Sequence, residues 1–334
     1  MRFPISLYTS LTGHFIKNAI KKNKKFPLVL MLEPTHRCNL ACAGCDRIRL
    51  YNNNNQETAD LSLDDCINAA IDCEAPVVTI TGGEPVLYQH LVPLVTKLIE
   101  LKKHIYLCTN GILTDSFIQR FTPNERLTLN FHLDGLEPTH DKIAGKIGTF
   151  NKAVENIKGA KQKGFRVTTN TSVYKNTSNR EIEELFLLLK GLNVDGILVS
   201  PAFSYETVAD DIFLTRKEVH AKFLELDSML RNFPLISSPI YMDFLKGNIQ
   251  MHCTPWGNPT RNPFGWKSPC YLITNSYYNS FAELIENTDW NRYENGLDER
   301  CTNCMVHSGY EASVMRTVYS NPKALFKLIG WNLT

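Results

Sequence analysis

The chain of 334 residues has no run of 18 or more apolar residues, so we expect no segment to cross a membrane. Its N-terminus has no continuous apolar stretch ending in a small-residue cleavage site, so a secretory signal is not expected. The net charge is only +2, which argues against a general polyanion binder and predicts no nucleic-acid partner. We therefore expect a globular protein of the cytoplasm, for which an apolar fraction of 43% is typical.

Cysteine, by contrast, is plentiful, and the ten cysteines are unevenly placed. In a reducing compartment, clustered thiols are more often metal ligands or catalytic groups than disulfides. Three lie within eight residues, at Cys38, Cys42 and Cys45. Four more lie in the C-terminal third: Cys253, Cys270, Cys301 and Cys304. Cys66 and Cys73 fall in an apolar helical stretch, where we interpret them as small buried hydrophobic residues.

Short β-rich runs alternate with amphipathic segments between about residues 28 and 200. The predicted strands are Leu28–Glu33, Val77–Thr81, Ile105–Thr109, Leu127–Leu133, Arg166–Ser172 and Gly196–Ser200. The predicted helices are 63–74, with Ser62 as its N-cap, 89–103, 149–163, 180–190 and 215–231. Six such units predict a partial (β/α)6 barrel, although the pattern alone also allows an open parallel sheet. We expect a basic amphipathic helix in 1–25, the barrel in 26–234 and an irregular cysteine-containing module in 235–334.

Two of the predicted strands have one polar face. Thr128, Asn130, His132 and Asp134 share a face opposite leucines and phenylalanine, and Tyr106, Cys108 and Asn110 share a face of the preceding strand. A fully buried parallel sheet is apolar on both faces, so these strands predict a polar cavity. Ligands in such folds bind at the C-terminal ends of the strands. Those ends carry Cys38 onward, Gly82-Gly83-Glu84, Asn110-Gly111, Asp134-Gly135 and Asn170.

The first cysteine group, Cys38-Asn-Leu-Ala-Cys42-Ala-Gly-Cys45, directly follows the first predicted strand. Three thiolates on one tight loop can bind three irons of a cubane and leave the fourth iron open to another donor. A closed zinc site requires four ligands, and the alternative interpretation is zinc with His36 as the fourth.

This loop resembles the C-x3-C-x2-C signature of the radical S-adenosylmethionine (SAM) superfamily. Gly82-Gly83-Glu84-Pro85 resembles the GGE motif that holds the SAM amino group in that family. The resemblance implies a [4Fe–4S] cluster on the three cysteines and SAM as co-substrate. One departure is Gly44, because many members place an aromatic residue there against adenine, so another group must hold adenine in this chain.

Four polar residues at strand ends are candidates for further cofactor contacts. Asn110, Asn130 and Asp134 are candidates for the ribose and methionine parts of SAM, and Asn170 is a further candidate. Each is also a residue type that commonly occupies turns and strand ends.

The four C-terminal cysteines are spaced Cys253-x16-Cys270-x30-Cys301-x2-Cys304. They are enough for a second iron–sulfur cluster or a zinc ion, and they could also remain unligated. A module poor in regular structure builds its own core with difficulty, which favours a metal staple. The arrangement is loosely similar to the auxiliary-cluster domains of peptide-modifying radical SAM enzymes.

Six stretches are similar to one radical SAM subfamily across nearly the whole chain. They are Cys38–Arg47, Tyr106–Leu113, His132–Gly135, Thr254–Cys270, Thr288–Tyr293 and Cys301–Ala312. The segments WGNPTRNPFGW and CMVHSGYEA resemble the hopanoid adenosyltransferases in particular. The resemblance implies transfer of the 5′-deoxyadenosyl group to the alkene of diploptene, which forms adenosylhopane. Ser308 stands where we expect cysteine in many relatives, so a thiol has no role at that position.

Such an addition leaves a tertiary carbon radical that must gain hydrogen, and a thiol is a good donor because its S–H bond is weak. Cys108 is the candidate donor, since it lies near a strand end on the face predicted to line the cavity. Tyr106, on the same face, is the reserve candidate. Cys108 could also be a small buried residue of the sheet.

Several features bear on the partners. Leu7, Leu11, Phe15 and Ile16 recur at helical spacing before five lysines, which is typical of a helix on an anionic membrane surface or of one packed on the barrel. A membrane-resident triterpene substrate and a contact with the inner face of the membrane would fit the first interpretation. The aromatic residues Trp256, Phe264, Trp266, Tyr271, Tyr277 and Tyr278 could wall an apolar pocket or belong to the core. A one-electron reductant such as flavodoxin or ferredoxin is expected.

Two other functions fit part of the pattern. A radical SAM enzyme that abstracts hydrogen from a peptide or small polar molecule would share the barrel and clusters, but it would release free 5′-deoxyadenosine. A non-catalytic metal-binding protein on a degraded barrel is disfavoured by the intact cysteine triplet and by Gly82–Pro85.

Overall fold

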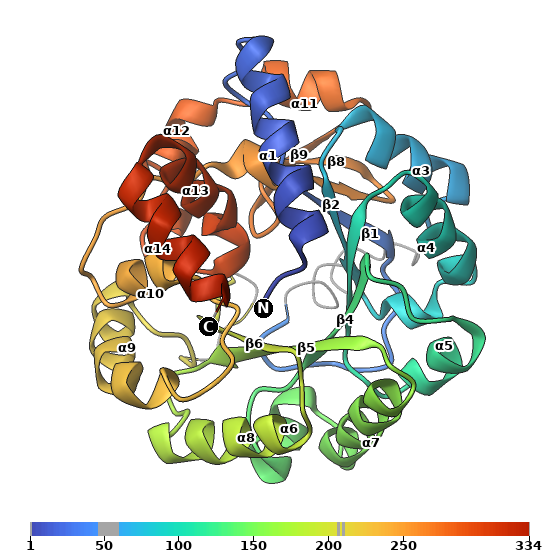
Figure 1. Cartoon of the computed structure of the whole chain (residues 1–334), viewed down its shortest axis with the longest axis vertical. Coiled ribbons are helices and arrows are strands. Elements are labelled where there is room, and N and C mark those ends of the chain that lie inside the picture. Colours follow the sequence, from blue (N-terminus) through green and yellow to red (C-terminus); the bar gives the residue numbers. More distant parts are fainter. Residues whose placement is uncertain (1, 46–59, 206–207, 209–210, 334) are drawn as a thin grey trace.

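The computed structural model describes residues 2–45, 60–205, 208 and 211–333. Six parallel strands form the first part of a curved sheet, and each predicted strand is confirmed with bounds that shift by one or two residues (Figure 1). They are β1 (Val29–Thr35), β2 (Val77–Gly82), β3 (His104–Thr109), β4 (Leu127–His132), β5 (Arg166–Val173) and β6 (Gly196–Pro201). Neighbouring strands pair in chain order, as expected for a partial barrel rather than a doubly wound sheet.

Helices cover the outer side of this sheet (Figure 1). They are α3 (Leu63–Asp72), α4 (Leu91–Glu100), α5 (Thr114–Arg120), α6 (Glu137–Ala144), α7 (Thr149–Gln162), α8 (Asn179–Gly191) and α9 (Arg216–Leu230). The five predicted helices are confirmed, and α5 and α6 are additional. The predicted cap also holds, because the Ser62 side chain accepts a hydrogen bond from the Asp65 amide at 3.0 Å.

The sheet has one apolar and one polar face where the sequence predicts it. Leu107, Leu129 and Phe131 are fully buried in the main core between strands and helices, and Cys66 and Cys73 lie in the same core as expected. The opposite side chains, including those of Asn130 and His132, line a cavity inside the barrel. The helices therefore pack against the outer face of the sheet, and the inner face lines the cavity.

The C-terminal region is more regular than the irregular module we expect from its sequence. It contains β7 (Thr260–Asn262), β8 (Gly265–Pro269), β9 (Thr274–Tyr278), α10 (Pro239–Leu245), α11 (Phe281–Asn287) and α12 (Trp290–Glu294). Two short 3-10 turns also belong to this region, η2 (Pro255–Gly257) and η3 (Glu299–Cys301), whereas a third, η1 (Pro85–Leu87), follows β2 in the barrel. Strand β7 pairs in parallel with β1, and β8 and β9 extend this edge, so the described sheet has nine strands and continues past residue 234. The domain boundaries themselves stay a prediction.

Three terminal helices lie together on one side of the barrel: α1 (Ile5–Ile20), α13 (His307–Ser320) and α14 (Pro322–Leu333) (Figure 1). Phe15 of α1 stacks on Tyr319 of α13 with ring centroids 3.8 Å apart. Phe3 packs against Trp331 of α14 at 5.9 Å. Among the described helices, none is both long enough and apolar enough to cross a bilayer.

Candidate active site

A cavity of about 380 Å³ lies inside the barrel, and one end of it is formed by the cysteine loop after β1. Cys38, Cys42 and Cys45 all line this end. The loop is fixed by its backbone, since the Cys45 amide donates to the Cys42 carbonyl at 3.1 Å and the Ala43 amide donates to the Ile143 carbonyl at 2.8 Å. The sequence thus places three thiols on one short, hydrogen-bonded segment that faces the cavity.

The environment of these thiols suits a cationic partner. Burial raises the pKa of Cys38 and Cys42, and neighbouring thiolates raise the pKa of Cys42 further. Thiolates in such a setting need positive charge, which iron supplies. His36 does not join them, because it is buried beside Glu33, 3.6 Å from its carboxylate, and against the ring of Phe264. The zinc alternative with His36 therefore has no support in this geometry. Among the described residues, no three metal-ligating side chains surround a single point.

Gly82 and Gly83 are required by the close approach of the cysteine loop. Gly82 has φ +110°, in the region that favours glycine, and a Cβ there would lie 2.5 Å from the Thr35 carbonyl oxygen. A Cβ on Gly83 would lie 2.1 Å from the Arg37 carbonyl oxygen. The turn after β2 therefore packs directly on the backbone that leads into the cysteines.

Glu84 is held almost completely buried at the cavity wall, with 1% of its surface exposed. Its carboxylate accepts hydrogen bonds from the Asn110 amide at 2.8 Å and from the Thr109 hydroxyl at 2.9 Å. Burial raises the pKa of Glu84 to about 7, although these hydrogen bonds lower it. Such a carboxylate binds an ammonium group well once ionised. Pro85 lies behind this wall, as the buried first residue of the turn η1, and does not line the described cavity.

The remaining predicted cofactor residues meet at the same end of the cavity, on β3, β4, β5 and the segments that follow them. The Asn110 side chain donates to Asn39 of the cysteine loop at 2.7 Å. Asp134 lies 2.8 Å from His132, and His132 contacts Asn170 at 3.1 Å. Burial lowers the pKa of His132, but the carboxylate of Asp134 outweighs it, so the pKa is raised. The buried Oδ1 of Asn170 has no partner among the described residues, which suits a ligand donor.

Tyr174, which the sequence reasoning missed, explains how the chain tolerates Gly44. A Cβ at position 44 would lie 2.6 Å from the Tyr174 hydroxyl oxygen. Tyr174 follows β5 and lines the cavity. An aromatic ring from the opposite side of the barrel therefore occupies the space beside Gly44.

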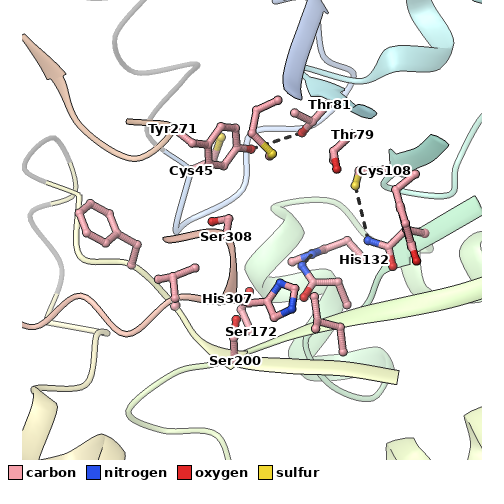
Figure 2. A pocket seen from close by; sticks show the side chains of 18 of the residues that line it. Cys45, Thr79, Thr81, Cys108, His132, Ser172, Ser200, Tyr271, His307 and Ser308 are labelled. Atoms are coloured by element: carbon pink, nitrogen blue, oxygen red, sulfur yellow. Dashed lines mark hydrogen bonds between the residues drawn. The ribbon is translucent and has the colours of Figure 1, made fainter. Parts of the chain in front are cut away.

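The predicted hydrogen donors lie deeper in the cavity. Cys108 and Tyr106 both line it from β3, and the Asn130 side chain donates to the Cys108 sulfur at 3.5 Å (Figure 2). Beyond them the lining becomes apolar. It includes Phe3, Val29, Met31, Val77, Leu198 and Ile236. The cavity is thus polar near the cysteine loop and apolar toward the start of the strands, with a thiol between the two parts.

Residues of the C-terminal region also line the cavity: Tyr271, which the sequence suggested as a pocket wall or core residue, and His307 and Ser308, which it did not indicate. Figure 2 shows Tyr271 next to Thr81, and His307 next to Ser172 and Ser200. The hydroxyl groups of Tyr271 and Thr81 are 3.3 Å apart. Ser308 thus lines the site as a hydroxyl where we expect a thiol in relatives. Of the other aromatic residues expected as a pocket wall or core, Trp256 and Trp266 are buried in the main core.

The four C-terminal cysteines all line a second cavity of about 340 Å³. Burial raises the pKa of Cys253 and Cys270, and it raises the pKa of Cys301 to about 11 and of Cys304 to about 12. Thiolates there also need a cationic partner. This second cavity shares Phe203, Tyr271, Leu272 and Ser308 with the first, so the two adjoin.

Two family models match the chain. The one described as Radical SAM superfamily matches residues 32–189, and the one described as Domain of unknown function (DUF3463) matches residues 197–328. Asp46 and Arg47, at the end of the first stretch with family resemblance, lie outside the described residues.

Two curated proteins illustrate the similarity. The chain is 32% identical over 164 residues to the GTP 3′,8-cyclase of Synechocystis sp., which is 47% of this chain and 48% of that enzyme. It is 26% identical over 309 residues to the antilisterial bacteriocin subtilosin biosynthesis protein AlbA of Bacillus subtilis. That alignment covers 84% of this chain and 64% of AlbA. The chain spans about half the length of the GTP 3′,8-cyclases it matches.

Two solved structures share the fold. Streptococcus suis SuiB bound to S-adenosylmethionine has a TM-score of 0.64 at 18% identity, over 91% of this chain and 78% of SuiB. anSMEcpe with bound AdoMet and Cp18Cys peptide has a TM-score of 0.58 at 17% identity, over 91% of this chain and 99% of that one. The curved parallel sheet with outer helices is therefore a known architecture.

Proposed function

Because the chain carries a domain of the radical SAM superfamily at residues 32–189, we propose that it adds the 5′-deoxyadenosyl group of SAM to the alkene of a hopanoid, diploptene, and forms adenosylhopane. The superfamily uses a [4Fe–4S] cluster and SAM. When bound, the cluster would supply the one electron needed to cleave SAM to methionine and a 5′-deoxyadenosyl radical. We assign the cluster to Cys38, Cys42 and Cys45.

The residues around that cluster suit SAM. Glu84, once ionised, accepts the SAM ammonium group, while Gly82 and Gly83 let the backbone approach. We assign Asn110, Asn130 and Asp134 to the ribose and methionine parts of SAM, Asn170 to a further polar contact, and Tyr174 to adenine. Their role is to fix the radical's carbon over the substrate and to exclude water, because this radical attacks nearly any C–H bond.

One observation carries the choice of substrate: the cavity changes from polar to apolar along its length, and Cys108 lies at the change. An apolar alkene in the deeper part would present its terminal carbon to the nucleoside radical. The new C–C bond leaves a tertiary carbon radical, which takes the hydrogen atom of the Cys108 thiol. The resulting thiyl radical then gains one electron from a reductant of the flavodoxin or ferredoxin class and one proton from solvent, which restores the thiol. Asn130 orients the sulfur.

Anaerobic reaction of the protein with SAM, reductant and diploptene tests this proposal. Mass spectrometry should find a lipid heavier by the whole nucleoside. Cys108→Ala should still consume SAM but give several-fold less saturated adduct, whereas Tyr106→Phe should give the normal yield. An unchanged yield with Cys108→Ala would reject the role of that thiol.

A second candidate is hydrogen abstraction from a peptide, favoured by the alignment with AlbA over 84% of this chain. Its product is free 5′-deoxyadenosine in amounts that match the modified peptide, with no nucleoside attached to the substrate. Product analysis therefore separates the two functions.

We assign the second cavity to an auxiliary iron–sulfur cluster held by Cys253, Cys270, Cys301 and Cys304. Four thiols around one cavity can ligate every iron of a cubane, so this cluster would be closed to SAM. We also propose that the helix within residues 1–25 contacts the inner face of the membrane, where a triterpene resides.

A further inference from the structure

Positive charge is concentrated at the two ends of the chain. Residues 1–25 contain six Lys and Arg and residues 312–334 contain three, and neither segment contains Asp or Glu. The whole chain has a net charge of only +2, so the rest of it is net negative. The fold brings both basic segments to the same side of the barrel (Figure 1).

Exposed apolar side chains are concentrated on the same helices. Of the fourteen exposed large apolar residues among those described, six belong to α1 and α14, which together make up less than a tenth of the chain. They are Ile5, Ile16, Ile20, Phe326, Ile329 and Leu333. Ile20 and Phe326 are 77% and 72% exposed. The opposite faces of these helices are buried through Leu7 and Leu11 of α1 and Leu328 of α14, so the exposed residues point away from the barrel.

The two helices are joined into one surface by their ends. The Phe3 amide donates to the Asn332 side chain at 2.8 Å, and the Arg2 guanidinium donates to the Trp331 carbonyl at 3.0 Å. Phe3 also lines the apolar end of the active-site cavity, together with Val29 and Val77 at the start of β1 and β2. The joint between α1 and α14 therefore lies at the deep end of that cavity.

We infer that α1 and α14 together form one docking surface for an anionic lipid bilayer. Binding through this surface would place the apolar end of the barrel cavity next to the membrane. Bulky apolar side chains would insert among acyl chains, while Lys21, Lys22 and Lys24, all exposed, would contact anionic headgroups. A polyanion such as nucleic acid would be served by the lysines but not by six exposed apolar residues. This inference rests on the proposed function for its purpose and extends it, because α14 and the apolar end of the cavity become part of lipid uptake.

Flotation with vesicles tests the surface without any catalytic step. The intact protein should float with vesicles of phosphatidylcholine plus phosphatidylglycerol, and weakly with phosphatidylcholine alone or at high salt. Phe326→Ser with Ile329→Ser on α14 should lower the bound fraction about tenfold, and so should Ile16→Ser with Ile20→Ser on α1. The matched control, Leu187→Ser with Leu224→Ser, removes equally exposed residues on α8 and α9 and should float normally.

Each other outcome overturns the inference. It fails if the protein does not float, if the α14 variant floats normally, or if these substitutions convert a dimer to a monomer in light scattering, which would make this surface a protein interface. The proposed function is judged separately. Adduct formation from detergent-dispersed diploptene without flotation would contradict the docking surface but not the reaction. Flotation without any adduct would contradict the proposed reaction but not the docking surface.

Discussion

The two cysteine groups differ in how the chain brings them together. Cys38, Cys42 and Cys45 come from one hydrogen-bonded loop, whereas the other four come from separate segments between residues 253 and 304. The first group is three thiols beside a polar part of its cavity, and the second is four thiols that line a cavity of similar size. With the clusters proposed above, the local group of three thiols would leave one iron open for chemistry, whereas the dispersed group of four would link segments that are otherwise held by packing.

The strongest test of this contrast removes a thiol from the first group, Cys38, Cys42 and Cys45, hereafter the open group. Cys42→Ala should abolish SAM cleavage and lower the iron content by about four atoms per chain, because two thiols cannot retain the cubane. Iron analysis and product quantification under anaerobic reduction measure both. Cys108→Ala, which removes a thiol from the same cavity but not from the loop, is the control and should keep its iron. SAM cleavage by Cys42→Ala at the normal rate would break the comparison.

A smaller effect is expected at the carboxylate beside the open group. Glu84→Gln should weaken SAM binding about 10- to 100-fold, because a charged hydrogen bond is lost. In the intact protein Glu84 has a pKa of about 7, above the ordinary value of 4.5. Below pH 7 the carboxyl group is protonated and must release its proton to bind an ammonium group, so affinity should fall as pH decreases, by at most about tenfold per pH unit.

Isothermal titration calorimetry between pH 6 and pH 8 follows this dependence. The affinity of Glu84→Gln should be nearly independent of pH over the same range. A pH dependence that survives the substitution would assign it to another group.

Tyr174 should have a modest effect of the same kind. Tyr174→Leu should weaken SAM binding by up to about tenfold through loss of aromatic contact, with little change in iron content. Tyr174→Phe keeps the ring and should bind SAM normally. If both variants bind equally poorly, the hydroxyl group matters rather than the ring.

The smallest effect on SAM cleavage is expected when a thiol is removed from the second group, Cys253, Cys270, Cys301 and Cys304. Cys304→Ser should lower the iron content by about four atoms per chain and lower the melting temperature, because the metal ties separate segments together. SAM cleavage should stay within about threefold of normal, in contrast to Cys42→Ala. A complete loss of cleavage would show that the two groups do not have separate roles.

The sequence predicted what depends on short-range pattern. Strict alternation along 127–134 placed Asn130 and Asp134 on the cavity side, because side chains of a strand alternate in direction. The Gly82–Glu84 turn was predictable since its glycines and its position after a strand are both visible in the chain. These features need no knowledge of distant contacts.

The features that the sequence did not reveal depend on long-range contacts. Tyr174 reaches Gly44 only because the sheet curves, and His307 and Ser308 reach the cavity only because the C-terminal region folds back over it. Strand β7 has three residues, too few for alternation to be recognised. Its pairing with β1 is therefore a property of the tertiary structure.

That pairing also has a consequence for dissecting the molecule. Met31 and Leu32 on β1 are bonded in register to Thr260 and Arg261, so cutting the chain after the sixth strand would strip hydrogen-bond partners from a central, apolar part of the sheet. Exposed strand edges of this kind recruit other chains. The amino-terminal two thirds expressed alone should therefore aggregate, and the two matched regions are expected to be inherited and to fold as one unit.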